Sequence, residues 1–385
     1  MRQTSSCFAT VICILLLLIF YYGSRLHRPW AYSSKNAKSP REKCYCADSD
    51  EDLCYRLPGN ESVVGTKFNC DSMRHLKKYG LGDTDQREFI DLTKDEMPEP
   101  VMVTAFSNSH YNGGLSLIST IRAQFPNQKI VVYDLGLHRL RVNFLKGLCN
   151  VEYRKFDFRE YPPYVRHLHE YRWKPIIIAD SLNEFGAIWY MDASVRLKKY
   201  NLNNIYNLLK CRRNEKFGNS AISTSSQPNY KLWDRNVLEC TKLAYLFHSF
   251  TGHGIYAATH PDVYNFIPTN FNKVKTEKAK MYEAGLVFAV KTREITDHIL
   301  KWSVLCALEK DCMAPVPLAT TCLFNGEDRY STYAHCHRFD QSVINVLAAN
   351  YANYDRHYYV SEIVDFFSID RSPVENISEL NFRCQ

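Results

Sequence analysis

The stretch that decides the fold is Ala187-Ile188-Trp189-Tyr190-Met191-Asp192-Ala193-Ser194, an apolar run that ends at a carboxylate followed by small residues. Such a run is typical of a buried β-strand. Open α/β sheets bind their ligands outside the carboxyl ends of the strands, which makes Asp192 the first candidate for chemistry. An aspartate at this place can also simply cap the next turn or helix, and that alternative stays open.

The segments before this run alternate between strand-like and helix-like patterns. Residues 101–106, 129–134 and 151–156 predict strands, and residues 115–121 and 173–182 have helical spacing. This alternation predicts an α/β fold with a mixed, mostly parallel sheet, right-handed crossovers and flanking helices.

Weaker patterns follow Asp192. Residues 200–209 predict a helix, residues 218–230 a loop, and residues 283–290 another apolar strand. An amphipathic helix is expected to begin at Asp340, where the carboxylate can serve as an N-cap.

Length, composition and charge restrict the class of protein. The chain has 385 residues, 45% of them hydrophobic, which is enough for one large domain or two modest ones with a core. The net charge of +7 is spread along the chain, and we find no nucleic-acid-binding motif. The sequence therefore predicts a small anionic ligand and no nucleic acid partner.

The N-terminus carries an uncharged apolar run over residues 8–22. A cleaved signal peptide is the alternative to a membrane anchor, but the run ends in Phe-Tyr-Tyr-Gly and lacks a small-x-small cleavage pattern. We therefore expect a cytoplasmic tail over residues 1–7 and an uncleaved transmembrane signal anchor over residues 8–22.

Cysteines and glycosylation sequons predict the orientation. Twelve of the 14 cysteines follow the apolar run, and Asn60 and Asn376 begin Asn-x-Ser sequons. An oxidising compartment favours both features, so we expect a single-pass type II protein of the Golgi or endoplasmic reticulum membrane with its C-terminal part in the lumen.

The polar, cysteine-containing residues 23–97 predict a luminal stem, and residues 98–385 predict a catalytic domain. A zinc site is the alternative for the clustered stem cysteines, but their spacing lacks the paired two-residue gaps of zinc ribbons and fingers, so we expect disulfides at Cys44, Cys46, Cys54 and Cys70.

Three segments carry a family resemblance: residues 190–194, 283–287 and 340–345. In order and hydrophobic context they resemble the hallmark segments of nucleotide-sugar-dependent glycosyltransferases with the GT-A fold, in the glycogenin-like and galactosyltransferase-like branch. Together with Trp173-Lys174-Pro175, the chain also resembles a nematode-rich family of uncharacterised glycosyltransferase-like proteins. The resemblance covers residues 101 to about 350 and implies a GT-A, Rossmann-like catalytic domain.

The resemblance implies a divalent cation, Mn²⁺ or Mg²⁺, that neutralises the departing diphosphate of a nucleotide-sugar donor. Asp192 matches the first acid of the Asp-x-Asp motif, Ser194 stands where the second acid would be, and His337 is a candidate third ligand. Alternatively, Arg172, Lys174 or Arg196 neutralises the diphosphate directly, or these basic residues form an ordinary solvated face.

Other site residues also follow from the resemblance. Nucleoside contacts are implied for Thr104, Ala105, Phe106 and Asp134, although Asp134 can also be a turn residue before Gly136. An inverting enzyme needs a carboxylate base at the acceptor hydroxyl, for which Asp340 and Glu283 are the candidates. Gln341 completes an Asp-Gln pair near the reacting sugar, and the stereochemical course stays open.

The leading hypothesis is a type II membrane glycosyltransferase that transfers a sugar from a nucleotide sugar to a glycan or glycoprotein acceptor. One alternative is a catalytically inactive, membrane-anchored glycan-binding protein with the same fold. A sulfotransferase is disfavoured because residues 107–114, which follow the first strand, contain no Lys or Arg that could bind phosphate there.

Overall fold

The computed structural model describes residues 44–372, except 48, 83–87, 211–242, 318, 325 and 327. The predicted anchor over residues 8–22, the loop over 218–230 and the sequon at Asn376 lie outside the described residues. Within the described part of the chain, no helix is both long enough and apolar enough to span a membrane.

A six-stranded mixed sheet forms the centre of the fold, in the order β5-β4-β3-β6-β11-β8. Its strands are β3 (Val101–Phe106), β4 (Ile130–Asp134), β5 (Val151–Lys155), β6 (Ala187–Asp192), β8 (Tyr245–Leu246) and β11 (Leu286–Val290). Strands β5, β4, β3 and β6 pair in parallel, whereas β11 runs antiparallel to both β6 and β8. The predicted α/β class with a mostly parallel sheet is confirmed.

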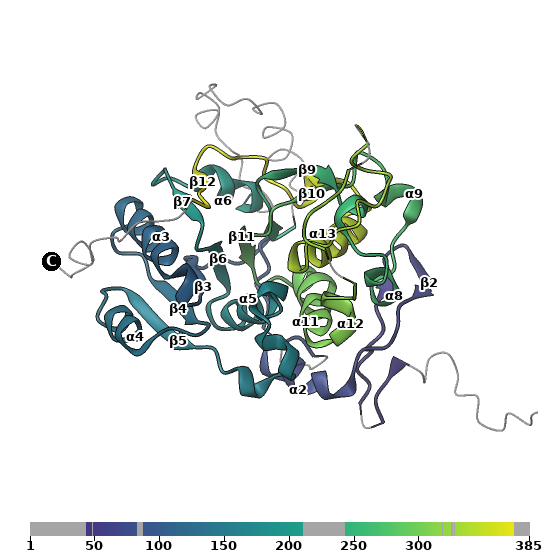
Figure 1. The fold of residues 1–385 in the computed structure, drawn as a ribbon, viewed down its shortest axis with the longest axis horizontal. Coiled ribbons are helices and arrows are strands. Elements are labelled where there is room, and N and C mark those ends of the chain that lie inside the picture. Colours follow the sequence, from purple (N-terminus) through teal and green to yellow (C-terminus); the bar gives the residue numbers. More distant parts are fainter. Residues whose placement is uncertain are drawn as a thin grey trace, which may run out of the picture. The chain divides into compact units, whose positions relative to one another are not determined.

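Helices cover both faces of this sheet. Helix α3 (Tyr111–Gln124) contacts β3, α4 (Arg139–Lys146) contacts β5, and α5 (Trp173–Phe185) contacts β6 and β3. With this strand order, the right-handed rule for parallel crossovers places α3 and α4 on one face and α5 on the other. Figure 1 shows α3 and α4 beside β3, β4 and β5, and α5 beside β6. The strands are buried on both sides, which explains why β3, β4 and β11 are continuous apolar runs without alternation.

The second half of the chain adds a helical layer next to α5. Helices α11 (Lys301–Leu308) and α13 (Asp340–Tyr351) pack together, and α11 also contacts α5. Shorter elements complete this half: α6 (Asn203–Lys210), α8 (Val263–Phe266), α9 (Phe271–Val274), α10 (Arg293–Ile295), a π-helical turn (Thr296–Leu300), α12 (Lys310–Met313), and the antiparallel pairs β9 (Phe250–Gly254) with β10 (Lys280–Tyr282) and β7 (Val195–Leu197) with β12 (Phe367–Ile369).

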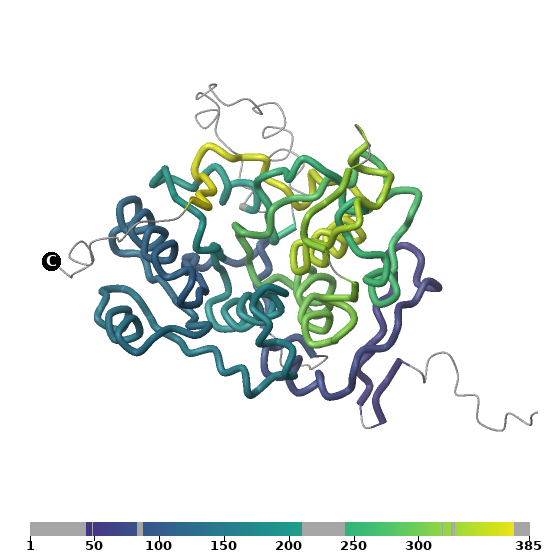
Figure 2. The backbone as a smooth tube through the Cα atoms, viewed as in Figure 1, coloured from purple at the N-terminus to yellow at the C-terminus, as the bar shows by residue number. Residues whose placement is uncertain are grey.

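The described N-terminal residues pack into the same core, which differs from the expected separate stem. They form β1 (Arg56–Leu57), β2 (Asn60–Val64) and α2 (Met73–Lys78), stapled by disulfides Cys44–Cys54 and Cys46–Cys70. Tyr55 and Phe68 are buried against Trp302 of α11. Figure 2 shows this purple segment running beside the green helices. Aromatic side chains in a polar, proline-broken stretch supply the apolar surface for this packing.

The predicted structural disulfides are present in both halves of the chain. Besides the two N-terminal bridges, Cys306–Cys312 and Cys322–Cys336 join residues of the second half. The second of these bridges lies shortly before α13 and closes the loop that leads into that helix.

Candidate functional site

Asp192 ends β6 at the point where the strand order of the sheet reverses. The chain builds β3, β4 and β5 outward in one direction and then returns to place β6 on the other side of β3. In the β3–β6 pair Asp192 is opposite Ala105, so both lie at the carboxyl edge of the two strands. This switch point is where open α/β sheets bind ligands.

The segment before β11 closes against Asp192. The Asp192 backbone N–H donates to the Gly285 carbonyl over 2.7 Å. A Cβ atom at position 285 would lie 2.9 Å from Oδ2 of Asp192. A side chain at position 285 would therefore displace the carboxylate, which gives a physical reason for glycine there.

Lys174, in the first turn of α5, joins Asp192 to the start of α13. Its Nζ lies 3.1 Å from Asp192 Oδ1 and 3.2 Å from Oδ2. The same Nζ lies 2.8 Å from Oδ2 of Asp340. We call Lys174, Asp192 and Asp340 the ionic triad. It brings together two carboxylates that are far apart in the sequence.

Asp340 is the more enclosed carboxylate of the ionic triad. Its side chain is 8% exposed, against 29% for Asp192. Its Oδ2 has an ion-pair contact with Lys174 but no aligned hydrogen bond within the described structure. The preceding Phe339 has a φ of +48°, a strained conformation for a bulky side chain. Strain of this kind is frequent at functional sites.

Burial and charge together shift the pKa values of the ionic triad. Burial alone would lower the pKa of Lys174, but Asp192 and Asp340 outweigh it and raise that pKa. Burial raises the pKa of Asp340, and the Lys174 ammonium opposes this shift. We conclude that the lysine is charged at neutral pH and that it counters the desolvation of Asp340.

Tyr190 is a site residue that the sequence reasoning missed. Its hydroxyl donates to Oδ1 of Asp192 over 2.9 Å, and its own pKa is raised by burial and by the nearby carboxylate. The sequence could have indicated this contact, because Tyr190 and Asp192 are two residues apart on one strand and such residues share one face of the sheet.

Glu283 and Gln341, both predicted to be catalytic, lie on the flanking segments but make other contacts. Oε1 of Glu283 is 3.3 Å from Nη2 of Arg371. Nε2 of Gln341 lies 3.2 Å from Sδ of Met281. The Gln341 backbone forms a hydrogen bond with Asp340, but among the described residues the side chains of Glu283 and Gln341 pair with Arg371 and Met281. Their predicted catalytic roles stay predictions.

The predicted nucleoside contacts lie along the same edge of the sheet. Thr104, Ala105 and Phe106 are buried in β3, and the Phe106 ring packs against Gly114 of α3. Asp134 ends β4 opposite Phe106. Its Oδ1 accepts the N–H groups of Gly136 and Leu137, and its Oδ2 accepts the Tyr153 hydroxyl. These hydrogen bonds match the turn alternative, which gives Asp134 a structural role.

Arg172 points away from the ionic triad. Its guanidinium donates to the carbonyls of Ala307, Glu309 and Lys310 at the end of α11 and pairs with Glu170. A buried cation that satisfies the last carbonyls of a helix has a structural function. We therefore leave Arg172 out of the proposed site.

The residues predicted to hold a metal ion do not form a suitable donor set. Both ring nitrogens of His337 are engaged, one with the Met313 carbonyl at 3.0 Å and the other with the His260 N–H at 3.2 Å. Burial lowers the pKa of His337 to about 4, so this ring is neutral. Ser194 follows Asp192 but offers at most a weak hydroxyl ligand, and Lys174 already contacts both oxygens of Asp192. The predicted ion therefore does not fit these residues as they stand.

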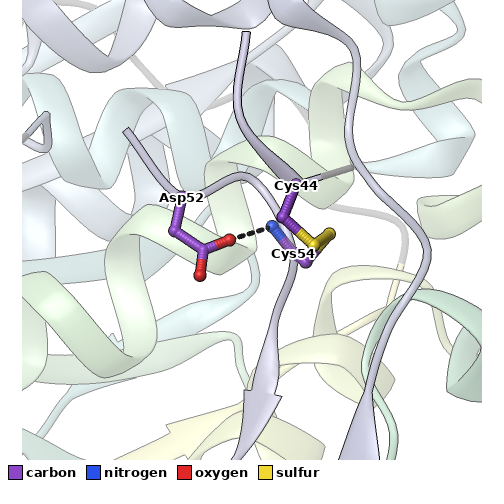
Figure 3. Close-up of side chains that lie close together, drawn as sticks. All are labelled: Cys44, Asp52 and Cys54. Carbon is purple, nitrogen blue, oxygen red and sulfur yellow. Dashed lines mark hydrogen bonds between the residues drawn. A yellow bond between two sulfur atoms is a disulfide. The ribbon is translucent and has the colours of Figure 1, made fainter. Parts of the chain in front are cut away.

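A second group of metal-binding side-chain types lies elsewhere. Among the described residues, the one cluster of His, Cys, Asp or Glu atoms close enough to share an ion is Cys44, Asp52 and Cys54. Figure 3 shows that the two sulfur atoms form a disulfide and that Asp52 accepts the Cys54 N–H, at 2.9 Å. Disulfide sulfurs are not thiolate ligands, so this cluster is structural.

A family model matches the N-terminal part of the chain. Residues 43–179 match a family described as a protein of unknown function (DUF1647). The matched residues include Lys174 but end before Asp192 and Asp340. No curated protein matches the sequence.

Three solved structures share a distant likeness with this chain, and each is described as a glycosyltransferase. The WbbM bifunctional glycosyltransferase is 12% identical with a TM-score of 0.37, over 69% of this chain and 39% of that one. The galactosyltransferase LgtC, in complex with donor and acceptor sugar analogues, is 14% identical with a TM-score of 0.35, over 71% and 87%. Mouse xyloside xylosyltransferase 1 is 9% identical with a TM-score of 0.33, over 72% and 99%.

Proposed function

We propose that this protein is a glycosyltransferase that moves a sugar from a nucleotide-sugar donor to a glycan or glycoprotein acceptor. One observation carries the proposal. The three segments that resemble glycosyltransferase motifs in the sequence meet at the switch point of the sheet, where Gly285 contacts Asp192 and Lys174 joins Asp192 to Asp340. Local sequence patterns do not require this convergence.

Asp340 is the residue we assign to the reacting sugar. In transfer, the bond from the anomeric carbon to the acceptor oxygen forms, the bond to the diphosphate oxygen breaks, and the acceptor hydroxyl loses a proton. A buried carboxylate whose pKa is raised is suited to accept that proton in an inverting reaction. In a retaining reaction the same carboxylate would instead stabilise positive charge at the anomeric carbon.

We also propose a secretory-pathway setting with the C-terminal part in the lumen, anchored by residues 8–22. The four described disulfides support an oxidising compartment. Asn60, which begins the first sequon, is exposed in β2 and accessible to a glycosylating enzyme.

The catalytically inactive glycan-binding protein remains the second candidate. Two observations favour it: Ser194 stands where a second acid is expected, and one lysine contacts both carboxylates of the site. The two candidates differ in whether the donor is consumed.

The test is a donor screen with the purified full chain. A panel of nucleotide sugars is incubated with and without acceptor glycans, and release of nucleoside diphosphate is measured for the wild type and for Asp340→Asn. We expect release with one donor, and a loss of at least about a hundredfold in the variant, as for removal of an essential acid–base group. Glycan binding without donor consumption for every donor would support the inactive candidate instead.

A further inference from the structure

The Lys174 ammonium lies in a shielded place among groups that stabilise a positive charge. Two carboxylates contact Nζ, at 2.8 Å for Asp340 and 3.1 Å for Asp192. The Lys174 side chain is 5% exposed, so the ion pairs are largely shielded from water. Shielding strengthens such contacts and makes an unpaired carboxylate at this place costly.

Aromatic rings surround the same ammonium. The ring centroids of Tyr171, Tyr190 and Trp173 lie 5.1, 5.5 and 5.9 Å from Nζ. Rings within about 6 Å of a cation attract it through their negative faces. Tyr171 reaches this place in the left-handed conformation, with a φ of +53°. Three rings and two acids form a cage for a compact organic cation.

Such a cage does not suit a divalent metal ion. Mg²⁺ requires oxygen ligands in octahedral geometry and retains several of its waters, whereas aromatic faces supply no ligand atoms. An ion that bridged Asp192 and Asp340 would also have to take the place of Nζ, which contacts both carboxylates. Like charges at this separation repel strongly in a shielded site.

We propose that Lys174 is a built-in cation that replaces the divalent ion, so that the site works without a metal. This inference rests on the proposed function for its catalytic meaning, but metal exclusion is a property of the folded protein that can be measured without any sugar transfer. The lysine holds Asp192 and Asp340 in one place, as a bridging metal ion would. Lys174 is therefore a positioning residue that acts through the two carboxylates.

The experiment is a Mn²⁺ titration of the full chain, monitored by the electron paramagnetic resonance signal of free Mn²⁺. At Mn²⁺ concentrations up to about 1 mM, we expect the wild type to show no Mn²⁺ site that is lost in Asp192→Asn. This range is wide enough to detect a weak carboxylate site. We expect Lys174→Met, which leaves two carboxylates without their cation, to gain one site at least tenfold tighter than any wild-type binding. The double variant Lys174→Met/Asp340→Asn should lose this gain.

Lys301→Met is the matched control. Lys301 is also a buried lysine in an ion pair and lies over a tryptophan ring, but it pairs with the single carboxylate of Glu51. Its substitution should create no Mn²⁺ site. Circular dichroism confirms that each variant is folded before its titration.

Two results would overturn the proposal. One is a wild-type Mn²⁺ site that disappears in Asp192→Asn. This measurement tests the proposal even if Lys174→Met does not fold. The other is a folded Lys174→Met that binds Mn²⁺ no better than the wild type. A lack of donor consumption would count against the proposed function and leave the titration unaffected, whereas an active wild type should keep its rate within twofold in EDTA.

Discussion

Replacing Asp192 by asparagine separates the charge of this residue from its shape. The amide oxygen of asparagine can still accept the Tyr190 hydroxyl that lies 2.9 Å from Oδ1. Lys174 also keeps its 2.8 Å contact with Asp340, so the ammonium is not left unpaired. The substitution therefore removes one negative charge and little else.

The substitution is expected to have two effects, one on stability and one on turnover. Removing one partner of a buried ion pair costs about 3–5 kcal/mol. Because Lys174 retains a second carboxylate and Asp192 is 29% exposed, we expect a smaller loss of about 1–2 kcal/mol in the free energy of unfolding. Loss of an electrostatic contribution at the reacting centre should lower turnover about a hundredfold or more, which corresponds to about 2.7 kcal/mol in the barrier.

Urea unfolding and donor turnover measure these effects on the same sample. The control is Asp180→Asn, because Asp180 is on α5 and likewise accepts a tyrosine hydroxyl, from Tyr133 at 2.7 Å, but lies outside the ionic triad. Asp180→Asn should keep wild-type turnover. If Asp192→Asn consumes the donor as fast as the wild type at saturating donor, Asp192 is a turn residue and the assignment of the site is wrong.

Three further changes test the site and its setting. Gly285→Ala places a Cβ 2.9 Å from Oδ2 of Asp192 and should lower turnover more than tenfold, with an unfolding cost of about 1–3 kcal/mol, whereas Gly147→Ala, which meets only ordinary contacts at 3.4 Å, should leave turnover unchanged. Burial lowers the pKa of His337 to about 4, so between pH 6.5 and 4 the unfolded chain takes up a proton that the native state refuses. As the pH is lowered through this range, the free energy of unfolding from urea curves should fall by up to about 1.4 kcal/mol per pH unit. His337→Gln should remove this part of the slope, and an identical slope in both proteins would refute the role of His337. Expressed through the secretory pathway, the chain should lose mass on glycosidase treatment, and an unchanged mass loss in Asn60→Gln would show that Asn60, though exposed, is not the acceptor.

The central strands could be predicted from the sequence because their information is local. The runs that form β3, β4 and β6 are short, apolar and bounded by turn residues, and such runs are typical of strands buried on both faces of a sheet. The direction of β11 could not be predicted, since an apolar run reads the same whether the strand is parallel or antiparallel. That direction matters here, because it brings Gly285 to Asp192.

The different roles of Arg172 and Lys174 show where sequence reasoning ends. Both are basic residues at the start of one helix, and both were candidates for neutralising a diphosphate. Arg172 binds the end of α11, whereas Lys174 binds Asp192 and Asp340. Which carbonyls and carboxylates meet each cation depends on contacts between distant parts of the chain, and no local pattern encodes these contacts.

The packing of the N-terminal segment sets an order for biosynthesis. Tyr55 contacts Asn350 across 295 residues of sequence. At about 5–20 residues per second, a ribosome needs roughly 15–60 s to make the chain between them. The helices that bury the aromatic side chains of the segment are made late in that interval.

The two disulfides of this segment can form during this interval. Cys44–Cys54 and Cys46–Cys70 span 10 and 24 residues, so both can close before the rest of the chain exists. Early closure would keep Tyr55 and its neighbours in a compact local structure while α11 and α13 are still to be made. The segment would then be ready to dock as soon as its last partner leaves the ribosome.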